Sequence, residues 1–265
     1  MILRRKVRPV MPEHLRRDKR ADVMIGIPSY GMWDAEFGMC LLGLVMDFLG
    51  GPVKGFEGQS LFVWKREGTI LPALRHALVR KAQERECTHL LFLDSDQTFP
   101  PYALRRLLEW HKPVVACNVA TKAEESYPTA RQKSGRDPKG RVVYTFPDYA
   151  GLEQVWRVGT GVMLVDMDVF AQVEPPWFNL KFRGGVDDYQ GEDWTFCEKL
   201  EMHGIPIYVD HGLSWEVGHR GPRTYKLLDV RLPEISDKAW EKLKELKDAK
   251  GLSEVREIWR ACENN

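Results

Sequence analysis

Two acidic residues follow a short apolar run near the middle of the chain. Asp94-Ser95-Asp96 comes directly after His89–Leu93 (HLLFL), a run that predicts a buried strand. In an extended chain both carboxylates point the same way, with Cα atoms roughly 6–7 Å apart. That distance favours different ligands for the two carboxylates: one binds a divalent cation, and the other holds a ribose or a metal-bound water. Hard oxygen ligands suit Mg²⁺ or Mn²⁺, and a diphosphate would complete the coordination.

Further polar residues lie in the second half of the sequence. Glu192 and Asp193 begin a predicted helix after the Gly-rich stretch Arg183–Gly185, where they either interact with the helix dipole or face a substrate. His219, in the sequence GHRG, follows a predicted strand, and a neutral imidazole can bind a metal beside carboxylates. We assign two neighbouring histidines to structural roles: His203 and His211.

Alternating strands and helices must position these residues in the first half. Strands are predicted at Val23–Pro28, Leu61–Trp64, His89–Leu93 and Pro113–Val119. Helices are predicted by apolar faces over Phe37–Leu49, over Leu71–Ala82 with Thr69 as its cap, and over Leu104–His111.

This alternation predicts an α/β fold with a mostly parallel sheet flanked by helices, because parallel strands need crossover connections. Ligands bind at the carboxyl ends of the strands in such sheets. Pro28–Gly31 and Asp94–Asp96 both fall at such ends, so we expect them to share one crevice.

The second half predicts a small antiparallel section. Residues 120–160 read as a long loop with short strands around Arg141–Phe146 and Val155–Val158. The loop is either a mobile surface segment or a lid that clamps a diphosphate. Its cations are Lys122, Arg131, Lys133, Arg136, Lys139 and Arg141. The elements predicted after it are a strand at Gly159–Val165, a helical turn at Asp166–Phe170, a helix at Gly191–Gly204, a strand at Ile205–Val209 and helices from Ser236.

Composition bounds the class of protein. The 265 residues, 43% of them hydrophobic, suit one α/β domain. The net charge of +1 argues neither for nor against nucleic acid as a partner. Residues 1–20 are basic, with eight Lys or Arg against two Asp or Glu. No segment reaches about 18 uninterrupted apolar residues, so we expect no membrane span. Five scattered cysteines predict reduced thiols in an intracellular protein: Cys40, Cys87, Cys117, Cys197 and Cys262.

These pieces, in this order, resemble the GT-A glycosyltransferases, especially bacterial and phage members related to the inverting family 2. The matching pieces are IPSYG, LRHALVRKA, LLFLDSD, VGTGVMLV, GEDWTFCEKLEMHGIPIYVD and GHRG, from Val23 to Gly221. The ordered set is more specific than the Asp-Ser-Asp triplet alone. The resemblance implies a GT-A (Rossmann-like) domain over residues 22–222, between a basic arm at 1–21 and a C-terminal helical extension at 223–265.

The resemblance also implies a role for each matching position. Asp96 and His219 would bind Mn²⁺ or Mg²⁺, and Asp94 would contact the ribose or a metal-bound water. Asp193 would be the better candidate for the general base, with Glu192 beside it. The nucleotide-sugar donor would lie along Pro28, Ser29, Tyr30, Arg75, Asp94, Ser95, Gly159, Thr160 and Gly161.

The function expected from the resemblance is metal-dependent sugar transfer, with inversion, from a UDP- or GDP-sugar to a hydroxyl of an unidentified acceptor. We expect a cytoplasmic location, with peripheral membrane attachment and homo-oligomer formation as further expectations. One alternative is a sugar nucleotidyltransferase, although the segment IPSYGMWDAEFG lacks the Lys or Arg of a phosphate loop. Another is a non-catalytic nucleotide-sugar-binding or scaffold protein. Nucleic-acid binding rests only on the basic arm.

Overall fold

A computed structural model describes residues 20–135, 137, 139–184 and 189–230. The predicted basic arm up to residue 19 and the helices predicted from Ser236 lie outside the described residues, as do Arg136 and Gly185. The first strand begins at Arg20, so the sheet takes in the last two residues of the range 1–21. In the part of the chain that the structure describes, no helix is long and apolar enough to cross a membrane.

The described residues contain one seven-stranded sheet, in the order β2-β1-β3-β9-β5-β12-β8. Five strands run in one direction, whereas β9 and β8 run antiparallel to their neighbours. The predicted mostly parallel α/β sheet is therefore confirmed, with an antiparallel strand at its centre. The strands are β1 (Arg20–Ser29), β2 (Gly58–Glu67), β3 (His89–Leu93), β5 (Val114–Ala116), β8 (Leu152–Val155), β9 (Val162–Asp166) and β12 (Ile207–Asp210).

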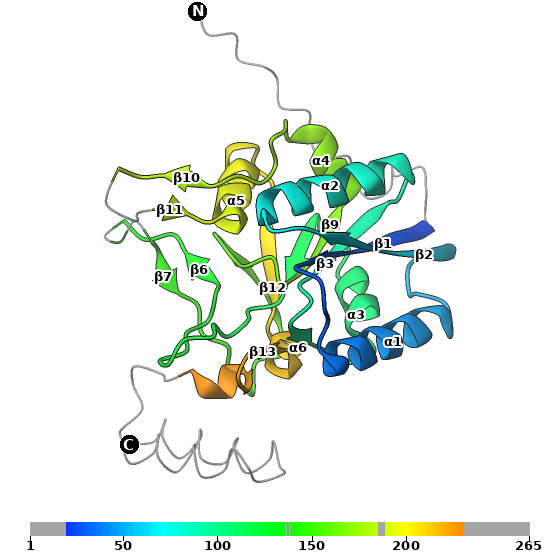
Figure 1. Cartoon of the computed structure of the whole chain (residues 1–265), viewed down its shortest axis with the longest axis horizontal. Coiled ribbons are helices and arrows are strands. Elements are labelled where there is room, and N and C mark those ends of the chain that lie inside the picture. The colour runs from blue at the N-terminus through cyan, green and yellow to red at the C-terminus, as the bar shows by residue number, and fades with distance from the viewer. Residues whose placement is uncertain (1–19, 136, 138, 185–188, 231–265) are drawn as a thin grey trace, which may run out of the picture.

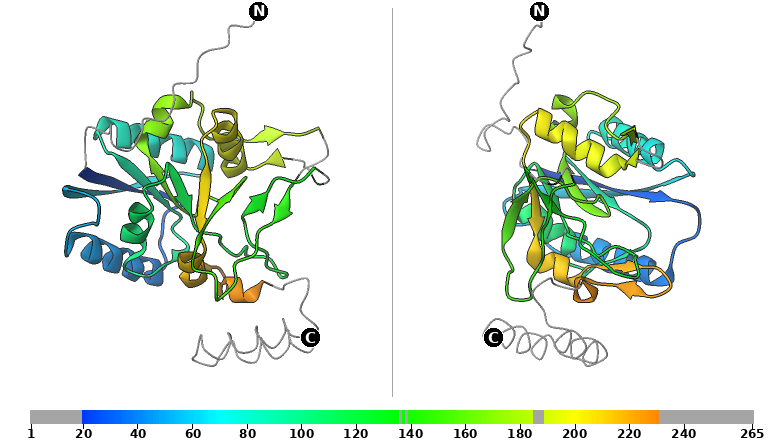
Figure 2. Two further views of the ribbon diagram at one scale, coloured as in Figure 1. Left: turned by 180° about the vertical axis from the view of Figure 1, so that it is seen from behind. Right: turned by 90° about the vertical axis from the view of Figure 1, so that its left-hand side faces the viewer.

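Helices cover both faces of this sheet (Figures 1 and 2). One face carries α2 (Leu71–Glu84), α4 (Met167–Gln172) and α5 (Glu192–Met202), and the other carries α1 (Ala35–Leu49), α3 (Ala103–Glu109) and α6 (His211–Glu216). Side chains that alternate along β3 enter the two cores, Leu90 and Phe92 on one side and Leu91 and Leu93 on the other. Burial on both faces explains why such strands read as continuous apolar runs.

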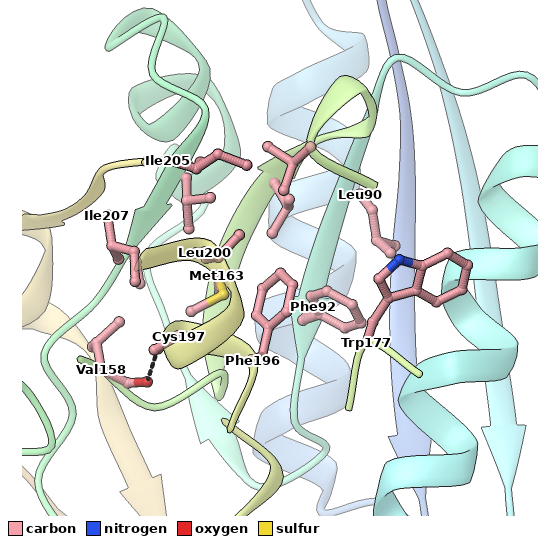
Figure 3. Close-up of a cluster of buried hydrophobic side chains, with 14 of the residues drawn as sticks. Leu90, Phe92, Val158, Met163, Trp177, Phe196, Cys197, Leu200, Ile205 and Ile207 are labelled. Atoms are coloured by element: carbon pink, nitrogen blue, oxygen red, sulfur yellow. Dashed lines mark hydrogen bonds between the residues drawn. The ribbon is translucent and has the colours of Figure 1, made fainter. Parts of the chain in front are cut away.

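The core beneath α5 is built from aromatic and aliphatic side chains. Phe196 of α5 packs on Phe178, with ring centroids 4.6 Å apart, and Phe178 meets Phe92 of β3 edge-on. Figure 3 shows Phe92, Phe196 and Trp177 together, with the Cys197 thiol donating to the Val158 carbonyl at 3.5 Å. This packing fixes α5 on the sheet, and with it the acidic residues at the start of α5. The four described cysteines are free thiols.

Two details of the predicted helices are wrong. The N-cap of α2 is Ile70, without a side-chain hydrogen bond, so Thr69 does not cap it. Pro72 instead suits the first turn, where no backbone N–H is needed. His111 lies beyond the end of α3, at φ 48°, and does not extend that helix.

Short strands form the small antiparallel section. The described ones are β4 (Gln97–Thr98), β13 (Gly218–Arg220) and β14 (Thr224–Tyr225) in one sheet, β6 (Arg131–Gln132) with β7 (Arg141–Val142), and β10 (Lys181–Phe182) with β11 (Tyr189–Gln190). A 3-10 helix, η2 (Leu227–Asp229), follows β14. The strand predicted around Val155–Val158 lies earlier, as β8.

Candidate active site

Asp94, Ser95 and Asp96 form a tight turn at the carboxyl end of β3. The Gln97 N–H donates to the Asp94 carbonyl at 3.1 Å, which closes the turn. The prediction of an extended chain through the triplet is therefore wrong, because β4 must leave β3 at once to pair with β13. The turn separates the two carboxylates, and each has its own partners.

The Asp96 carboxylate lies between two basic side chains. Its Oδ2 is 2.5 Å from Lys122 Nζ and 3.5 Å from His219 Nε2. Burial opposes ionisation of Asp96, but the hydrogen bonds to His219 and Lys122 outweigh it and lower the pKa to about 2. Asp96 is therefore an anion throughout the physiological pH range.

His219 is oriented by the main chain on its other side. Its Nδ1 lies 3.0 Å from the Ala120 carbonyl oxygen, which can only accept, so Nδ1 carries a proton. When Nε2 is also protonated, it donates the hydrogen bond that lowers the pKa of Asp96; when it is not, it presents a lone pair toward the carboxylate. Two acceptors facing each other at 3.5 Å suit a cation between them, and a carbonyl behind the ring is typical of metal-binding histidines.

This donor set supplies two protein ligands. The described residues contain no group of three or more His, Cys, Asp or Glu side chains placed to hold a metal ion. Asp94, predicted as a further metal contact, faces Arg75. Asp96 and His219 therefore fit a hard cation whose remaining ligands come from a donor or from water.

Arg75 joins three elements at this edge of the sheet. The side chain extends from α2, is only 2% exposed, and places Nη2 2.9 Å from Asp94 Oδ1 and 3.0 Å from Asp94 Oδ2. Its Nε lies 3.3 Å from Glu192 Oε1 at the start of α5. Burial opposes the charge, but Asp94 and Glu192 outweigh it and raise the pKa of Arg75. The ion pairs bring the end of β3 and the start of α5 together.

Asp193, next to Glu192 in the first turn of α5, has a perturbed carboxyl group. Burial, followed by the negative charge of Glu192, raises its pKa to about 6, although the Trp194 N–H donates to it at 2.6 Å. A carboxylate with such a pKa is a stronger base than an ordinary Asp and is still ionised at neutral pH.

Several buried polar atoms near the acidic turn lack a hydrogen-bond partner among the described residues. They are Arg75 Nη1, Gln97 Oε1 and Thr160 Oγ1. Unpaired buried polar groups are costly and often mark the position of a polar ligand or water. Gly161 lies beside this turn, because its carbonyl accepts from the Asp94 N–H at 2.9 Å. A Cβ at Gly161 would lie 3.1 Å from Gln97 Nε2, so this position has little room for a side chain.

The other residues predicted along the donor lie at the ends of strands and in loops. Pro28 and Ser29 end β1, and the Ser29 hydroxyl accepts from the Gly31 N–H and from Trp33 Nε1, both at 3.1 Å. Tyr30 is exposed, and Gly159 faces Thr129. Ser95 lies within the turn itself.

The sequence did not indicate which cation of the 120–150 segment would reach the acidic turn. Lys122 does so, whereas Lys133 pairs with Glu201 and Arg131 is buried against the Pro128 and Ala130 carbonyls. The roles of Gln97 and of the Ala120 carbonyl were also missed. A signal existed for Lys122, because it stands three residues after the predicted strand Pro113–Val119 and so near its carboxyl end.

Comparisons with known proteins give structural matches only. No family model matches the chain, and no curated protein matches its sequence. Protein A197 from STIV has a TM-score of 0.47 and 17% identity, over 76% of this chain and 86% of A197. Residues 1–349 of S. aureus TarS, solved with UDP-GlcNAc, have a TM-score of 0.41 and 14% identity, over 72% of this chain and 56% of that one. Similarity at this level carries neither a substrate nor a reaction to this chain.

Proposed function

We propose that this chain is a metal-dependent glycosyltransferase, which transfers a sugar from a nucleoside-diphosphate sugar to an acceptor hydroxyl with inversion. The observation that carries the proposal is the pairing of Asp96 with His219 across 3.5 Å, with the His219 ring oriented by the Ala120 carbonyl. The buried Arg75 ties this pair's turn to the helix that presents Asp193. Arg75 therefore links the turn that carries the candidate metal ligand Asp96 to the helix that carries the candidate base Asp193.

Asp96 and His219 would hold Mn²⁺ or Mg²⁺. When bound, the metal would neutralise the charge that develops on the departing diphosphate. Arg75 holds Asp94 in place for a contact with the ribose. Asp193 would accept the proton of the acceptor hydroxyl as the new glycosidic bond forms.

The test is a thermal-shift screen of nucleoside diphosphates and their sugars, with and without Mn²⁺. A ligand that binds only the folded state raises the melting temperature, so a metal-dependent rise identifies the donor. We expect Asp96→Ala to abolish both that rise and the sugar transfer, while its melting temperature without ligand stays close to that of the wild type. Full transfer by this variant, or full transfer in excess chelator, contradicts the proposal. Release of pyrophosphate from a nucleoside triphosphate and a sugar phosphate would instead identify a nucleotidyltransferase.

A further inference from the structure

A groove with a mostly apolar lining lies along the outer face of α2. Its volume is about 970 Å³, and it is lined by α2, by β2 and by the segment 176–180. Sites of this size and composition usually hold a small organic molecule, with a few polar groups that fix its orientation. We call this site the α2 groove, and its apolar side chains include Trp64, Ile70, Ala73, Ala77, Phe178 and Leu180.

The apolar part of the α2 groove is open to an extended chain. Ala73, Ala77 and Lys81 follow one another by four positions, so they share one face of the helix. The two alanine side chains are small and leave space above the helix. Ile70 is 66% exposed and Leu180 56%, so apolar surface in the groove is in contact with water. A ligand with an apolar body would cover this surface.

Positive charge lines the same groove. Lys81 is paired with Glu84 at 3.0 Å, and its Nζ lies over the Trp64 ring. Arg66 of β2 and Arg80 of α2 have no carboxylate partner among the described residues. Three cations against one carboxylate give the lining a net charge of +2. Two guanidinium groups are therefore available to an anionic ligand.

The Arg80 side chain is held in place by an aromatic contact. Its guanidinium carbon lies 5.4 Å from the Trp177 ring centroid, and the His76 ring stacks on the same tryptophan at 4.6 Å. Trp177 is itself fixed, because its Nε1 donates to the Val173 carbonyl at 2.7 Å. Burial and the charge of Arg80 lower the pKa of His76, so His76 is neutral at pH 7. The charge of the groove thus comes from Arg and Lys, which stay ionised.

We propose that the α2 groove binds a single-chain amphiphilic anion, an aliphatic chain that ends in a carboxylate or a phosphate. The chain lies along Ala73 and Ala77, and Arg66 and Arg80 bind the charged head. A guanidinium group donates paired hydrogen bonds to either kind of head, which is why the two are one ligand class here. The α2 groove shares no residue with the candidate active site, so the proposal is independent of the proposed glycosyl transfer.

Single-stranded nucleic acid is the competing ligand, and the aromatic rings disfavour it. Bases stack on open aromatic faces. Here Trp177 is only 2% exposed, and the Lys81 ammonium lies over the Trp64 ring. A bilayer surface is disfavoured as well, because anionic membranes are recognised by clusters of about four to eight Lys or Arg. A concave site with two unpaired cations suits one small molecule.

The test is isothermal titration calorimetry of the full chain with decanoate and with decyl phosphate, each below the concentration at which it forms micelles. We expect one bound molecule per chain. Acetate and inorganic phosphate carry the heads without the chain, and decyldimethylamine oxide carries the chain without a net charge. These three compounds should show no measurable binding, because each lacks one of the two contributions.

Two variants separate the contributions of charge and of apolar surface. Arg66→Glu combined with Arg80→Glu should weaken binding by about tenfold or more, because two attractions become repulsions. Ala77→Trp should abolish binding, because the indole fills the space above the helix. Lys65→Glu combined with Arg141→Glu is the matched control, with the same change of net charge at exposed positions outside the groove. This control should bind as the wild type does.

Three results would overturn the proposal. They are a wild type that binds neither amphiphile, a wild type that binds decyldimethylamine oxide as tightly as decanoate, and unchanged affinity in the variant with two glutamates in the groove. Binding of an oligothymidylate instead of the amphiphiles, lost in that variant, would reassign the groove to nucleic acid. Binding of only decanoate would identify a fatty acid, and binding of only decyl phosphate an alkyl phosphate. Circular dichroism and thermal melts verify that each variant is folded.

Discussion

At the residue scale, the site depends on which partner each carboxylate has. Asp96 is held ionised by two basic neighbours, whereas Asp193 is half-buried beside Glu192 and holds its proton more tightly than an ordinary Asp. Groups with such different proton affinities suit a metal ligand and a base respectively. The difference arises from environment alone, since both are aspartates with the same intrinsic pKa.

Asp193→Asn should stabilise the protein and abolish sugar transfer. The folded-state pKa of Asp193 is raised from 3.8 to about 6, so the folded state binds the proton more tightly than the unfolded state. Proton binding by Asp193 therefore contributes to the free energy of unfolding, fully below pH 3.8, and this contribution is lost as pH rises through about 6. At pH 8 the carboxylate is charged, and its poor solvation destabilises the fold. Removing this charge by Asp193→Asn should raise the free energy of unfolding at pH 8 by on the order of 1–3 kcal/mol.

Urea unfolding at pH 8 and pH 4 measures this effect, and the advantage of the variant should disappear at the lower pH. In the wild type, kcat/KM should fall as pH drops below about 6, because the base becomes protonated. A variant no more stable than the wild type at pH 8 would show that Asp193 is not held in a destabilised ionised form.

Lys122→Ala should tighten Mn²⁺ binding in the absence of nucleotide. The Lys122 ammonium lies on the Asp96 oxygen that also faces His219, so it repels a cation placed there. Removing one positive charge at this distance should tighten binding by about fivefold to tenfold. Isothermal titration calorimetry provides the measurement, with Lys139→Ala from the same segment as the control. Equal affinities in Lys122→Ala and wild type would mean that the metal does not bind at Asp96.

At the element scale, α2, β3 and α5 are joined at the buried Arg75. α2 presents the guanidinium, the turn after β3 presents Asp94, and the first residue of α5 presents Glu192. The sequence predicted each of these elements from its apolar pattern, and Arg75 from the resemblance. It did not predict that Arg75 would pair with both acids, which lie 19 and 117 positions from it along the chain.

Arg75→Met should destabilise the protein strongly. The substitution leaves the carboxylates of Asp94 and Glu192 partly buried without their cation, which costs about 3–5 kcal/mol. Arg75→Lys should recover part of the lost stability, since Lys keeps the positive charge but lacks the planar guanidinium with its several N–H donors. Urea unfolding at pH 7 measures both variants, and Arg66→Met, at an exposed position of β2, is the control. A Met variant within about 1 kcal/mol of the wild type would show that the two ion pairs contribute little.

Local sequence could not have predicted the features set by distant pairing. The turn at Asp94–Asp96 is imposed by the pairing of β4 with β13, more than a hundred residues later. Gly159–Val165 was predicted as a strand, but its direction follows from its neighbours β3 and β5 and not from its own residues. Apolar periodicity reports burial, which is why strand and helix positions were found and the strand direction was not.

At the scale of the whole molecule, one continuous sheet carries the Arg75 contacts at one end and has helices on both faces (Figure 1). The two core layers hold the strands rigidly, so the candidate site residues can lie on turns and on the first turn of α5.

The position of β9 has a consequence for biosynthesis. β9 lies between β3 and β5 in the sheet, although the ribosome makes it after both. A nascent chain that ends before Val162 therefore holds the β2-β1-β3 part of the sheet with its β3 edge exposed, while β5 still lacks both of its neighbours, β9 and β12. Gly161, whose carbonyl holds Asp94, emerges immediately before β9. The sheet is completed only when β12 has been made, and the acidic turn only when β13 pairs with β4, so the nascent protein gains its continuous core before its site.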